Sequence, residues 1–547
     1  MTIETTARTD TAGTQSTSDR RPEPAKQPVA MRLSPERALR LPLAFVLGLL
    51  ALGLLPAVRQ NAAVLWSFLG AAAALVVWSA VLFVSARRVG RTLTLAIDLR
   101  RQHYLQACAQ GSVLLYWGWY WRPVYESAHL IAAQLLFAYA FDMLLSWWRR
   151  DAYTLGFGPF PVIFSINLFL WFRPEWFYLQ FLMVALGFAA KELIRWEKDG
   201  RRAHIFNPSS FPLAVFSLGL ILTGTSDITW GQDIAITQFY PPHMYLMLFL
   251  IGLPGQFFFG VTSMTMSAVV TTYLFGLIYY ATNGVYFFYD SYIPIAVFLG
   301  MHLLFTDPST SPRTELGRVI FGMLYGLSTV VLYQLLLAAG IPAFYDKLLQ
   351  VPILNLSIKL IDRVARSKPL RALDPAALGR SLAPRQRNLA YMSLWALVFV
   401  IMSAVQGVGD AHPGQWVPFW QEACQKERPN ACRYLADMEA RYCNRGSGWA
   451  CNELGILQAR RERDYVSALE SMQHGCQLGF VPACNNANRS TGTGAFQAGP
   501  PTLDDYPIIL RGSKSPITER TPAALLALAC RQGWSDTCER SKTAGAE

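Results

Sequence analysis

Two short polar turns stand out in a chain that is otherwise apolar between residues 41 and 408. The first is Asn207, Pro208, Ser209, Ser210, x, Pro212, and the second, 100 residues later, is Asp307, Pro308, Ser309, Thr310, x, Pro312. Asn or Asp before Pro favours a turn, and the hydroxyls that follow can cap a helix N-terminus. The pattern predicts either two capped helix starts at one surface or an internal duplication. Transporter folds place ligand and ion sites where such repeats meet.

Ionisable side chains within apolar segments are a second group of candidates, because burying them in a bilayer is costly. Glu126 and His129 are three residues apart, so on one helix they share a face and could pair, and Asp142 lies further along the same segment. These three side chains either pair with neighbouring helices in a structural role or belong to a functional site. His302 stands one turn before Asp307 and is a candidate for contact with a proton or a quinone.

Hydroxyl groups after a Pro-Gly step form a third group. Pro254 and Gly255 interrupt an apolar run, and Thr262, Ser263, Thr265 and Ser267 follow. A broken helix with hydroxyls around the break can coordinate ions or anionic headgroups. The same residues are also compatible with a tight turn between two short helices.

The elements that must position these residues are transmembrane helices. Of the 547 residues, 52% are hydrophobic and only 15% are charged. We count about thirteen apolar segments, which begin near residues 41, 63, 105, 124, 157, 175, 211, 243, 261, 291, 319, 349 and 390. The sequence therefore predicts an all-α, polytopic transmembrane bundle over residues 41–408. Residues 1–40 are predicted to be a disordered basic cytoplasmic tail. The stretch from Met31 also resembles a signal peptide, but we favour an uncleaved first helix because it begins so far from Met1.

Arginine clusters give the predicted orientation. The net charge of +12 is dispersed in short clusters between apolar runs, which does not suggest a nucleic-acid surface. With thirteen alternating spans, the clusters near residues 87–101, 149–150, 191–202 and 359–387 share one side with the N-terminus. The positive-inside rule makes that side cytoplasmic. Aromatic clusters at 115–123 and 169–178 are then predicted at the outer side, as a headgroup belt or as a cofactor-stacking surface.

The turn at Asn207 and the run LFTDPSTSPRTELGRVIFGMLYG resemble a family of membrane subunits. This family comprises the D subunit of the Rnf electron-transport complex and the B subunit of the sodium-pumping NADH:quinone reductase. The resemblance covers residues 120–340 approximately. It implies a flavin-carrying subunit, with FMN or riboflavin, that serves electron transfer coupled to cation movement, in contact with a quinone and other membrane subunits of an oxidoreductase complex.

The cofactor motifs of that family are incomplete in this chain. The S-G-A-T sequence that carries covalent FMN is absent, and the corresponding loop, SDITWGQDIAITQF, offers only Thr229 and Thr237. The membrane part also has no CxxC motif and no Gly-rich nucleotide fingerprint. A flavin or quinone would therefore be held non-covalently, near the two turns and the hydroxyls named above, or supplied by a partner. No catalytic residue is assigned. The alternative is a non-redox scaffold or transporter that kept the fold and lost the flavin.

Eight of the nine cysteines lie after residue 420 and form four pairs with seven residues between the members: Cys424 and Cys432, Cys443 and Cys451, Cys476 and Cys484, Cys530 and Cys538. The third pair follows the second after 33 residues, from Cys443 to Cys476 and from Cys451 to Cys484. A period of this length is typical of a tetratricopeptide-like solenoid. The segment is similar to the cysteine-rich Sel-one-like repeats of secreted bacterial proteins, and this resemblance implies a disulfide that ties each helix pair to the next. Zinc is the rival interpretation, but zinc ligands are usually closer in sequence. We expect residues 409–547 to be a periplasmic, protein-binding repeat domain on a bacterial inner membrane protein, interrupted by a polar insertion at 488–516.

Overall fold

The computed structural model describes residues 29–198, 200–378, 381–405, 408–410, 412–489, 496–510 and 521–544. Most of the predicted N-terminal tail, residues 1–28, lies outside this part. Residues 29–33 form strand β1 (Val29–Leu33), and a short helix, α1 (Pro35–Ala38), follows it. The predicted disordered tail therefore does not extend over residues 29–38, because β1 pairs with a second strand, β2 (Leu93–Ile97).

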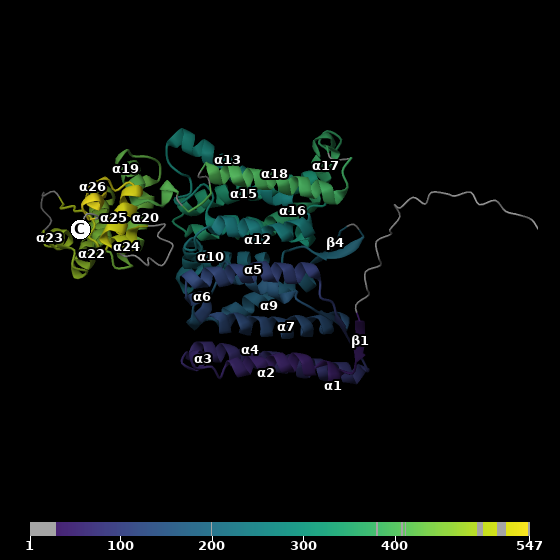
Figure 1. Ribbon diagram of the computed structural model, residues 1–547. Coiled ribbons are helices and arrows are strands. Elements are labelled where there is room, and N and C mark those ends of the chain that lie inside the picture. Colours follow the sequence, from purple (N-terminus) through teal and green to yellow (C-terminus); the bar gives the residue numbers. More distant parts are fainter. Residues whose placement is uncertain are drawn as a thin grey trace, which may run out of the picture.

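The central part of the chain is a bundle of helices that lie side by side (Figure 1). Each of the thirteen predicted apolar segments contains a helix. These helices are α2 (Arg40–Leu52), α4 (Ala62–Val89), α5 (Arg101–Tyr120), α7 (Ala128–Arg150), α8 (Pro159–Asn167), α9 (Tyr178–Leu193), α10 (Ser210–Thr223), α12 (Met244–Phe259), α13 (Thr262–Asn283), α14 (Ile295–Leu303), α15 (Glu315–Ala338), α16 (Gln350–Ala365) and α18 (Pro384–Ala404).

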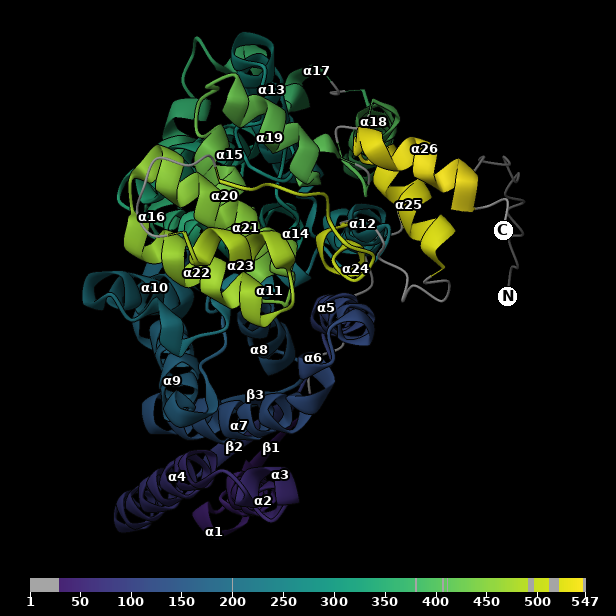
Figure 2. The same cartoon turned by 90° about the vertical axis from the view of Figure 1, so that its left-hand side faces the viewer.

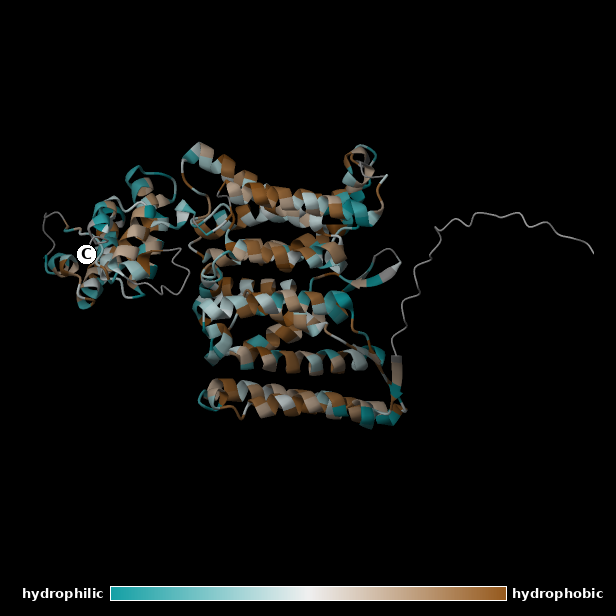
Figure 3. Ribbon diagram, in the orientation of Figure 1, coloured by the Kyte–Doolittle hydropathy of each residue, from teal (hydrophilic) through white to brown (hydrophobic). Residues whose placement is uncertain are grey.

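Within the described residues, five of these helices are long and apolar enough to cross a membrane: α4, α7, α13, α15 and α18. The chain is therefore a mostly helical membrane protein. Hydrophobic residues predominate along the middle of the bundle, and hydrophilic residues gather toward its two ends (Figure 3). Most of the other helices are shorter, such as α8 and α14 with 9 residues each. A count of thirteen spans stays a prediction, since a helix of 9 residues rises only about 14 Å.

Two small sheets depart from the predicted all-α fold. In the first, β2 lies between β1 and the parallel strand β3 (Ala152–Leu155). The second is a hairpin of β4 (Arg195–Lys198) and β5 (Arg201–His204). Both sheets lie beyond the ends of helices, where backbone groups no longer find partners within a helix and pair across strands instead.

Both sheets lie at one end of the bundle, and the cysteine-rich helices lie at the other (Figure 1). α4 leads into β2, α7 leads into β3 and α9 leads into the hairpin. The arginine clusters at 87–101, 149–150 and 191–202 therefore share the end opposite the cysteine-rich helices.

The shorter helices are connectors. They are α3 (Pro56–Arg59), α6 (Pro123–Glu126), α11 (Gly231–Thr237) and α17 (Pro375–Leu378), with 3-10 turns at Pro174–Trp176, Ser226–Ile228, Pro308–Thr310, Ala343–Lys347, Arg371–Leu373 and Pro413–Gln415. Viewed along the bundle, α2 and α4 form a pair at its edge, next to α7 (Figure 2).

The C-terminal domain consists of short helices. They are α19 (Val417–Gln425), α20 (Ala431–Cys443), α21 (Gly448–Leu457), a π turn at Gln458–Glu462, α22 (Tyr465–Gln477), α23 (Val481–Ala487), α24 (Tyr506–Ile509), α25 (Pro522–Arg531) and α26 (Ser535–Ala544). Ala468 and Met472 on α22 are buried, as predicted.

Disulfides join Cys424 to Cys432, Cys443 to Cys451, Cys476 to Cys484 and Cys530 to Cys538, so the predicted pairing is confirmed. That these helices form a solenoid stays a prediction.

The C-terminal domain shares its hydrophobic core with the bundle. Residues 285–288 and three side chains of α15, namely Val330, Tyr333 and Leu337, belong to the same buried cluster as α19–α21. The Tyr434 hydroxyl donates to the Phe287 carbonyl (2.8 Å). The domain is thus packed onto the bundle rather than tethered to it.

Candidate functional site

The two proline turns, 100 residues apart in sequence, are in direct contact. The Asn207 side-chain amide donates to the Leu304 carbonyl (3.0 Å), and His204 Nε2 lies 3.2 Å from Asp307 Oδ2. Asn355 of α16 bridges the two turns. Its Oδ1 accepts from the Asn207 N–H (3.1 Å), and its Nδ2 donates to the Thr310 carbonyl (3.2 Å). The structure therefore brings both turns to one place.

Each turn is closed by its own first side chain, whereas we predicted that the hydroxyls after the proline would cap the helix; Ser209 makes no side-chain cap. Asn207 Oδ1 accepts from the N–H groups of Ser209 and Ser210 and from the Ser209 hydroxyl. Asp307 Oδ1 accepts from the Ser309 N–H (2.9 Å), and its Oδ2 lies 3.3 Å from the Thr310 hydroxyl. These side chains satisfy backbone donors that have no partner within a helix.

A glycine on α9 allows the first turn to approach. A Cβ on Gly187 would lie 2.3 Å from the Pro208 carbonyl oxygen. That separation is far below van der Waals contact, so any larger residue here must displace the turn.

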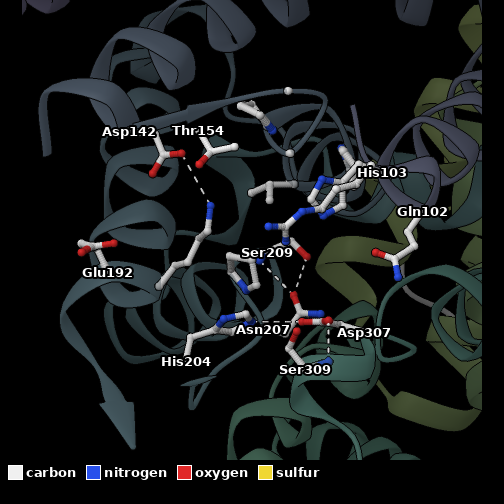
Figure 4. A pocket seen from close by; sticks show the side chains of 18 of the residues that line it. Gln102, His103, Asp142, Thr154, Glu192, His204, Asn207, Ser209, Asp307 and Ser309 are labelled. Carbon is white, nitrogen blue, oxygen red and sulfur yellow. Dashed lines mark hydrogen bonds and ion pairs between the residues drawn. The ribbon is translucent and has the colours of Figure 1, made fainter. Parts of the chain in front are cut away.

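Both turns lie in the wall of a cavity of about 500 Å³ at the end of the bundle that carries the arginine clusters. In Figure 4, His204, Asn207, Asp307 and Ser309 lie together, with Asp142 and Glu192 to one side and Gln102 and His103 to the other. The lining side chains come from α5, α7, α8, α9, β3, β5 and the two turns. Of the residues predicted from the sequence, Asp142, Asn207, Pro208, Ser209 and Asp307 line this cavity.

The cavity is lined by charges of both signs. The cations are Arg100, Arg150, Lys191, Arg195 and Arg202, and the anions are Asp98, Asp142, Glu192 and Asp307. Lys191 Nζ lies 3.5 Å from Asp142 Oδ2, and Arg150 Nε lies 3.0 Å from Glu192 Oε1. Asp142 and Glu192 are buried. Buried charges that lack such partners would be strongly disfavoured.

Asp307 is held ionised by its neighbours. Burial alone raises the pKa of this carboxyl, but the hydrogen bond and positive charge of His204, with the Ser309 N–H and the Thr310 hydroxyl, outweigh burial and bring its pKa below the usual value. Asp307 is thus an anion at neutral pH, in contact with a histidine that faces the cavity.

Beyond the cavity, a polar network continues into the bundle. Ser165 lines the cavity and accepts from Gln110 Nε2 (2.7 Å). Two residues further on, Asn167 exchanges two hydrogen bonds with Gln134, and Gln134 Oε1 also accepts from Gln180 (3.2 Å).

This network lies where α8 ends inside the bundle and the chain continues without a helix. Gln180 accepts from the Phe172 N–H, and Gln238 donates to the Leu168 carbonyl (2.6 Å). The amide side chains therefore satisfy an unwound backbone at membrane depth, as a bilayer requires.

The aromatic clusters at 115–123 and 169–178 contain both exposed and interior tryptophans. Trp119 and Trp176 are exposed, as a headgroup belt requires, but Trp117, Trp121 and Trp171 stack in the interior, with ring centroids 5.0 to 5.7 Å apart.

Thr237 lies against this interior stack. Its hydroxyl accepts from Trp117 Nε1 (3.1 Å) and its side chain is buried. Thr229 is also buried and donates to the Ser226 carbonyl. Neither hydroxyl lines the cavity of the two turns.

The remaining predicted residues lie away from the cavity lining. Thr262 donates to Asn388 (3.2 Å), and Thr265 is buried in α13. α12 continues through Pro254 and Gly255, so neither of the two alternatives, a helix break or a tight turn, occurs at that step; the chain turns only at Gly260, where φ is +63°.

His302 is buried. Its Nδ1 lies 2.7 Å from the Phe298 carbonyl, and its ring packs near Trp395. It does not line the cavity with Asp307.

Glu126 and His129 lie near the opposite end, where α6 ends and α7 begins. We predicted that they share one helix face. The helix is interrupted at Ser127, and no ion pair joins the two among the described residues. Of the three ionisable candidates on this segment, only Asp142 faces the cavity.

Sequence reasoning missed His103, Lys191, Glu192 and His204. The last three stand at the two ends of the run KELIRWEKDGRRAH. We used the basic residues of this run only to predict the orientation in the membrane. The signal that could have identified them is a run that mixes both charge signs at the end of an apolar helix.

A metal-like cluster of Cys443, Cys451 and His474 occurs in the C-terminal domain. Both of its sulfurs form a disulfide with each other, so they offer no thiolate ligand.

Comparisons of the chain with protein-family models, with curated proteins and with solved structures find no match. The two family resemblances therefore stay predictions.

Proposed function

We propose that this protein is the ion-translocating membrane subunit of an electron-transfer complex, of the Rnf D and reductase B kind. The ion enters through the cavity that the two proline turns form. The observation that carries the proposal is the meeting of these turns, through His204 and Asn355, at a charged cavity.

Repeat-built transporters place their ion sites where two repeats meet and where helices are discontinuous. In this chain two turns of similar sequence meet beside a short helix: α8 starts at the cavity and ends inside the bundle at Asn167. Gln110 bonds to Ser165 in the cavity wall, and Gln134 bonds to Asn167 further in. These polar side chains support the proposal, because they can contact an ion as well as satisfy the unwound backbone.

We expect the entering ion to bind at the ion pair of Asp142 and Lys191. Asp142 is buried, and its carboxylate is 3.5 Å from the Lys191 ammonium. An entering cation can pair with this carboxylate in place of the ammonium, because the Lys191 side chain is 31% exposed and can turn its charge toward solvent.

The transport test uses the full chain in proteoliposomes, together with its co-purifying subunits, and follows ion flux with an entrapped dye. We expect Asp142→Asn to reduce the flux at least tenfold. Asp227→Asn removes an exposed carboxylate away from the cavity and should leave the flux unchanged. Equal flux in the wild type and in Asp142→Asn would refute the cavity as the ion path.

The second candidate function is a transporter without a redox role. It is favoured by the buried hydroxyls of Thr229 and Thr237, which are both hydrogen-bonded within the protein. Absorbance near about 450 nm, before and after denaturation, separates the two candidates, since bound flavin absorbs there. Absence of flavin in the complex isolated with all its subunits would favour the second.

We further propose that the protein lies in a bacterial inner membrane with the cavity end in the cytoplasm and the C-terminal domain in the periplasm, where it docks a partner. Arginine clusters at one end and four disulfides at the other support this orientation. A cysteine introduced at Asp227 should react with an impermeant maleimide from outside. Labelling of that cysteine only after the membrane is opened would contradict the orientation.

A further inference from the structure

The polar insertion that interrupts the cysteine repeats is anchored to the domain. The Gln497 carbonyl accepts from the side-chain amides of Asn452 (3.1 Å) and Asn486 (2.8 Å), and the Gln497 N–H donates to Asn486 Oδ1 (2.7 Å). Two residues later, the Gly499 carbonyl accepts from Trp449 Nε1 (3.0 Å). Because its backbone is hydrogen-bonded to buried side chains, the segment 497–499 is an integral part of the domain fold.

The anchored insertion forms one wall of a second cavity, of about 220 Å³. Residues 498–501 form this wall, and Trp449 and Glu453 of α21 and Trp534 and Asp536 near α26 form the others. The two indole rings lie edge to face, with centroids 5.2 Å apart. We call this cavity the insertion cleft.

Two disulfides fix the walls of the insertion cleft. Cys451, in the bridge to Cys443, is two residues from Trp449 and two from Glu453. The bridge from Cys530 to Cys538 spans the turn that holds Trp534 and Asp536. The cleft is therefore preorganised, which lowers the entropic cost of binding.

The chemistry of the insertion cleft is acidic and aromatic. It is lined by two carboxylates, Glu453 and Asp536, and no Lys or Arg is among the described residues that line it. Arg540 lies 3.7 Å from Asp536 but is not part of the wall. Carboxylates beside indole rings attract a cation, and the alkyl part of a lysine or arginine side chain packs against tryptophan and proline.

Burial disfavours the ionised form of Glu453. It raises the pKa of this carboxyl to about 7, against the opposing effects of Asn452 and Arg460. The groups that face it are Glu439 of α20, which is buried and acidic, Arg460 after α21, and Asp536 across the cleft. A ligand cation is the partner that would restore the charged form.

We propose that the insertion cleft binds a lysine or arginine side chain of a partner polypeptide. The proposal deepens the docking role proposed above and rests on it, but it does not depend on ion transport or on flavin. It assigns the docking contact to the insertion and the disulfide-fixed tryptophans.

The test uses the full chain in lipid nanodiscs and three acetylated, amidated pentapeptides, Gly-Gly-X-Gly-Gly, in which X is lysine, norleucine or glutamate. Norleucine keeps the alkyl chain of lysine without its charge. We expect the lysine peptide to bind at least tenfold more tightly than the norleucine peptide by calorimetry, and the glutamate peptide not to bind. Glu453→Gln and Asp536→Asn should each weaken lysine-peptide binding about tenfold.

Glu539→Gln is the matched control, because it removes an exposed carboxylate from the same helix as Asp536, three residues away. It should bind the lysine peptide like the wild type. Equal affinity for lysine and norleucine peptides, unchanged binding in both acidic-site variants, or no binding of the lysine peptide would each overturn the proposal. So would N-acetyl-lysine methylamide binding as tightly as the pentapeptide, because the cleft would then accept a small amine without a polypeptide. Since binding is measured without flux or absorbance, its failure would not affect the transport proposal.

Discussion

Replacing Glu453 with glutamine should stabilise the C-terminal domain above neutral pH. Glu453 lies on α21 beside Trp449, in the wall of the insertion cleft. Glutamine has the same shape and keeps the hydrogen bonding to Asn452, but it carries no ionisable group.

The size of the effect follows from the pKa. In the unfolded chain this carboxyl ionises near pH 4.5, whereas burial raises its pKa to about 7 in the folded state. Between these values the unfolded state releases a proton that the folded state keeps, so raising the pH destabilises the fold. The difference between these two pKa values lowers the free energy of unfolding by about 3 kcal/mol at pH 8 and has no effect below pH 4.5. Stability is therefore lost in the wild type as pH rises through this window, and Glu453→Gln should not lose it.

Hydrogen–deuterium exchange of the full chain in nanodiscs measures this effect locally. Backbone amides of α20 and α21 exchange through local opening, and about 3 kcal/mol corresponds to a change of about a hundredfold in protection. We expect these amides to exchange up to about a hundredfold more slowly in Glu453→Gln than in the wild type at pH 8. At pH 4.5 or below, the two should be equal.

Glu470→Gln on α22 is the control, because Glu470 is exposed. It should not change the protection of α20 and α21 at either pH. Equal protection of wild type and Glu453→Gln at pH 8, or a difference of the same size at both pH values, would refute the reasoning. Together with weaker binding of the lysine peptide, greater stability of this variant would show that the wild-type carboxylate is kept for a ligand at a cost to the fold.

Three further changes test the site and the domain. Asn355→Ala should remove both hydrogen bonds that bridge the two turns and cost about 3 kcal/mol, seen as a lower melting temperature of the purified protein. Gly187→Ala should displace the Asn207 turn and reduce ion flux, whereas Gly219→Ala, where a Cβ meets nothing within 4 Å, should have little effect on either stability or flux. Removing Cys476 and Cys484 together should destabilise the C-terminal domain by about 2.5 kcal/mol, measured as faster hydrogen exchange in α22 and α23, and no change would refute a stabilising role.

Local patterns in the sequence predicted several features correctly. The paired cysteine spacing and the resemblance to cysteine-rich repeats predicted the four disulfides. The Asn-Pro and Asp-Pro steps predicted the two turns, although the caps come from Asn207 and Asp307 and not from the hydroxyls. Both features depend on neighbours within a few positions.

Features that depend on distant neighbours were missed. The three-stranded sheet forms because Ala152 at the end of α7 meets Thr94 after α4, and the pairing of β1 adds residues far from both. Lys191 became part of the site only because α9 packs beside α7, which brings its ammonium to Asp142. The helix break at Ser127 separates Glu126 from His129, and no proline or glycine at that position signals it in the sequence.

α15 connects the two ends of the molecule. Its 24 residues extend over about 36 Å. At one end, Asp362 accepts hydrogen bonds from the Arg313 and Thr314 N–H groups, a few residues after Asp307. At the other, Tyr333 and Leu337 are part of the core of the C-terminal domain. A helix is stiff along its axis, so a load on the C-terminal domain is transmitted along α15 toward the turn at Asp307. Force on this domain and the shape of the cavity at the opposite end of the bundle are thereby mechanically linked.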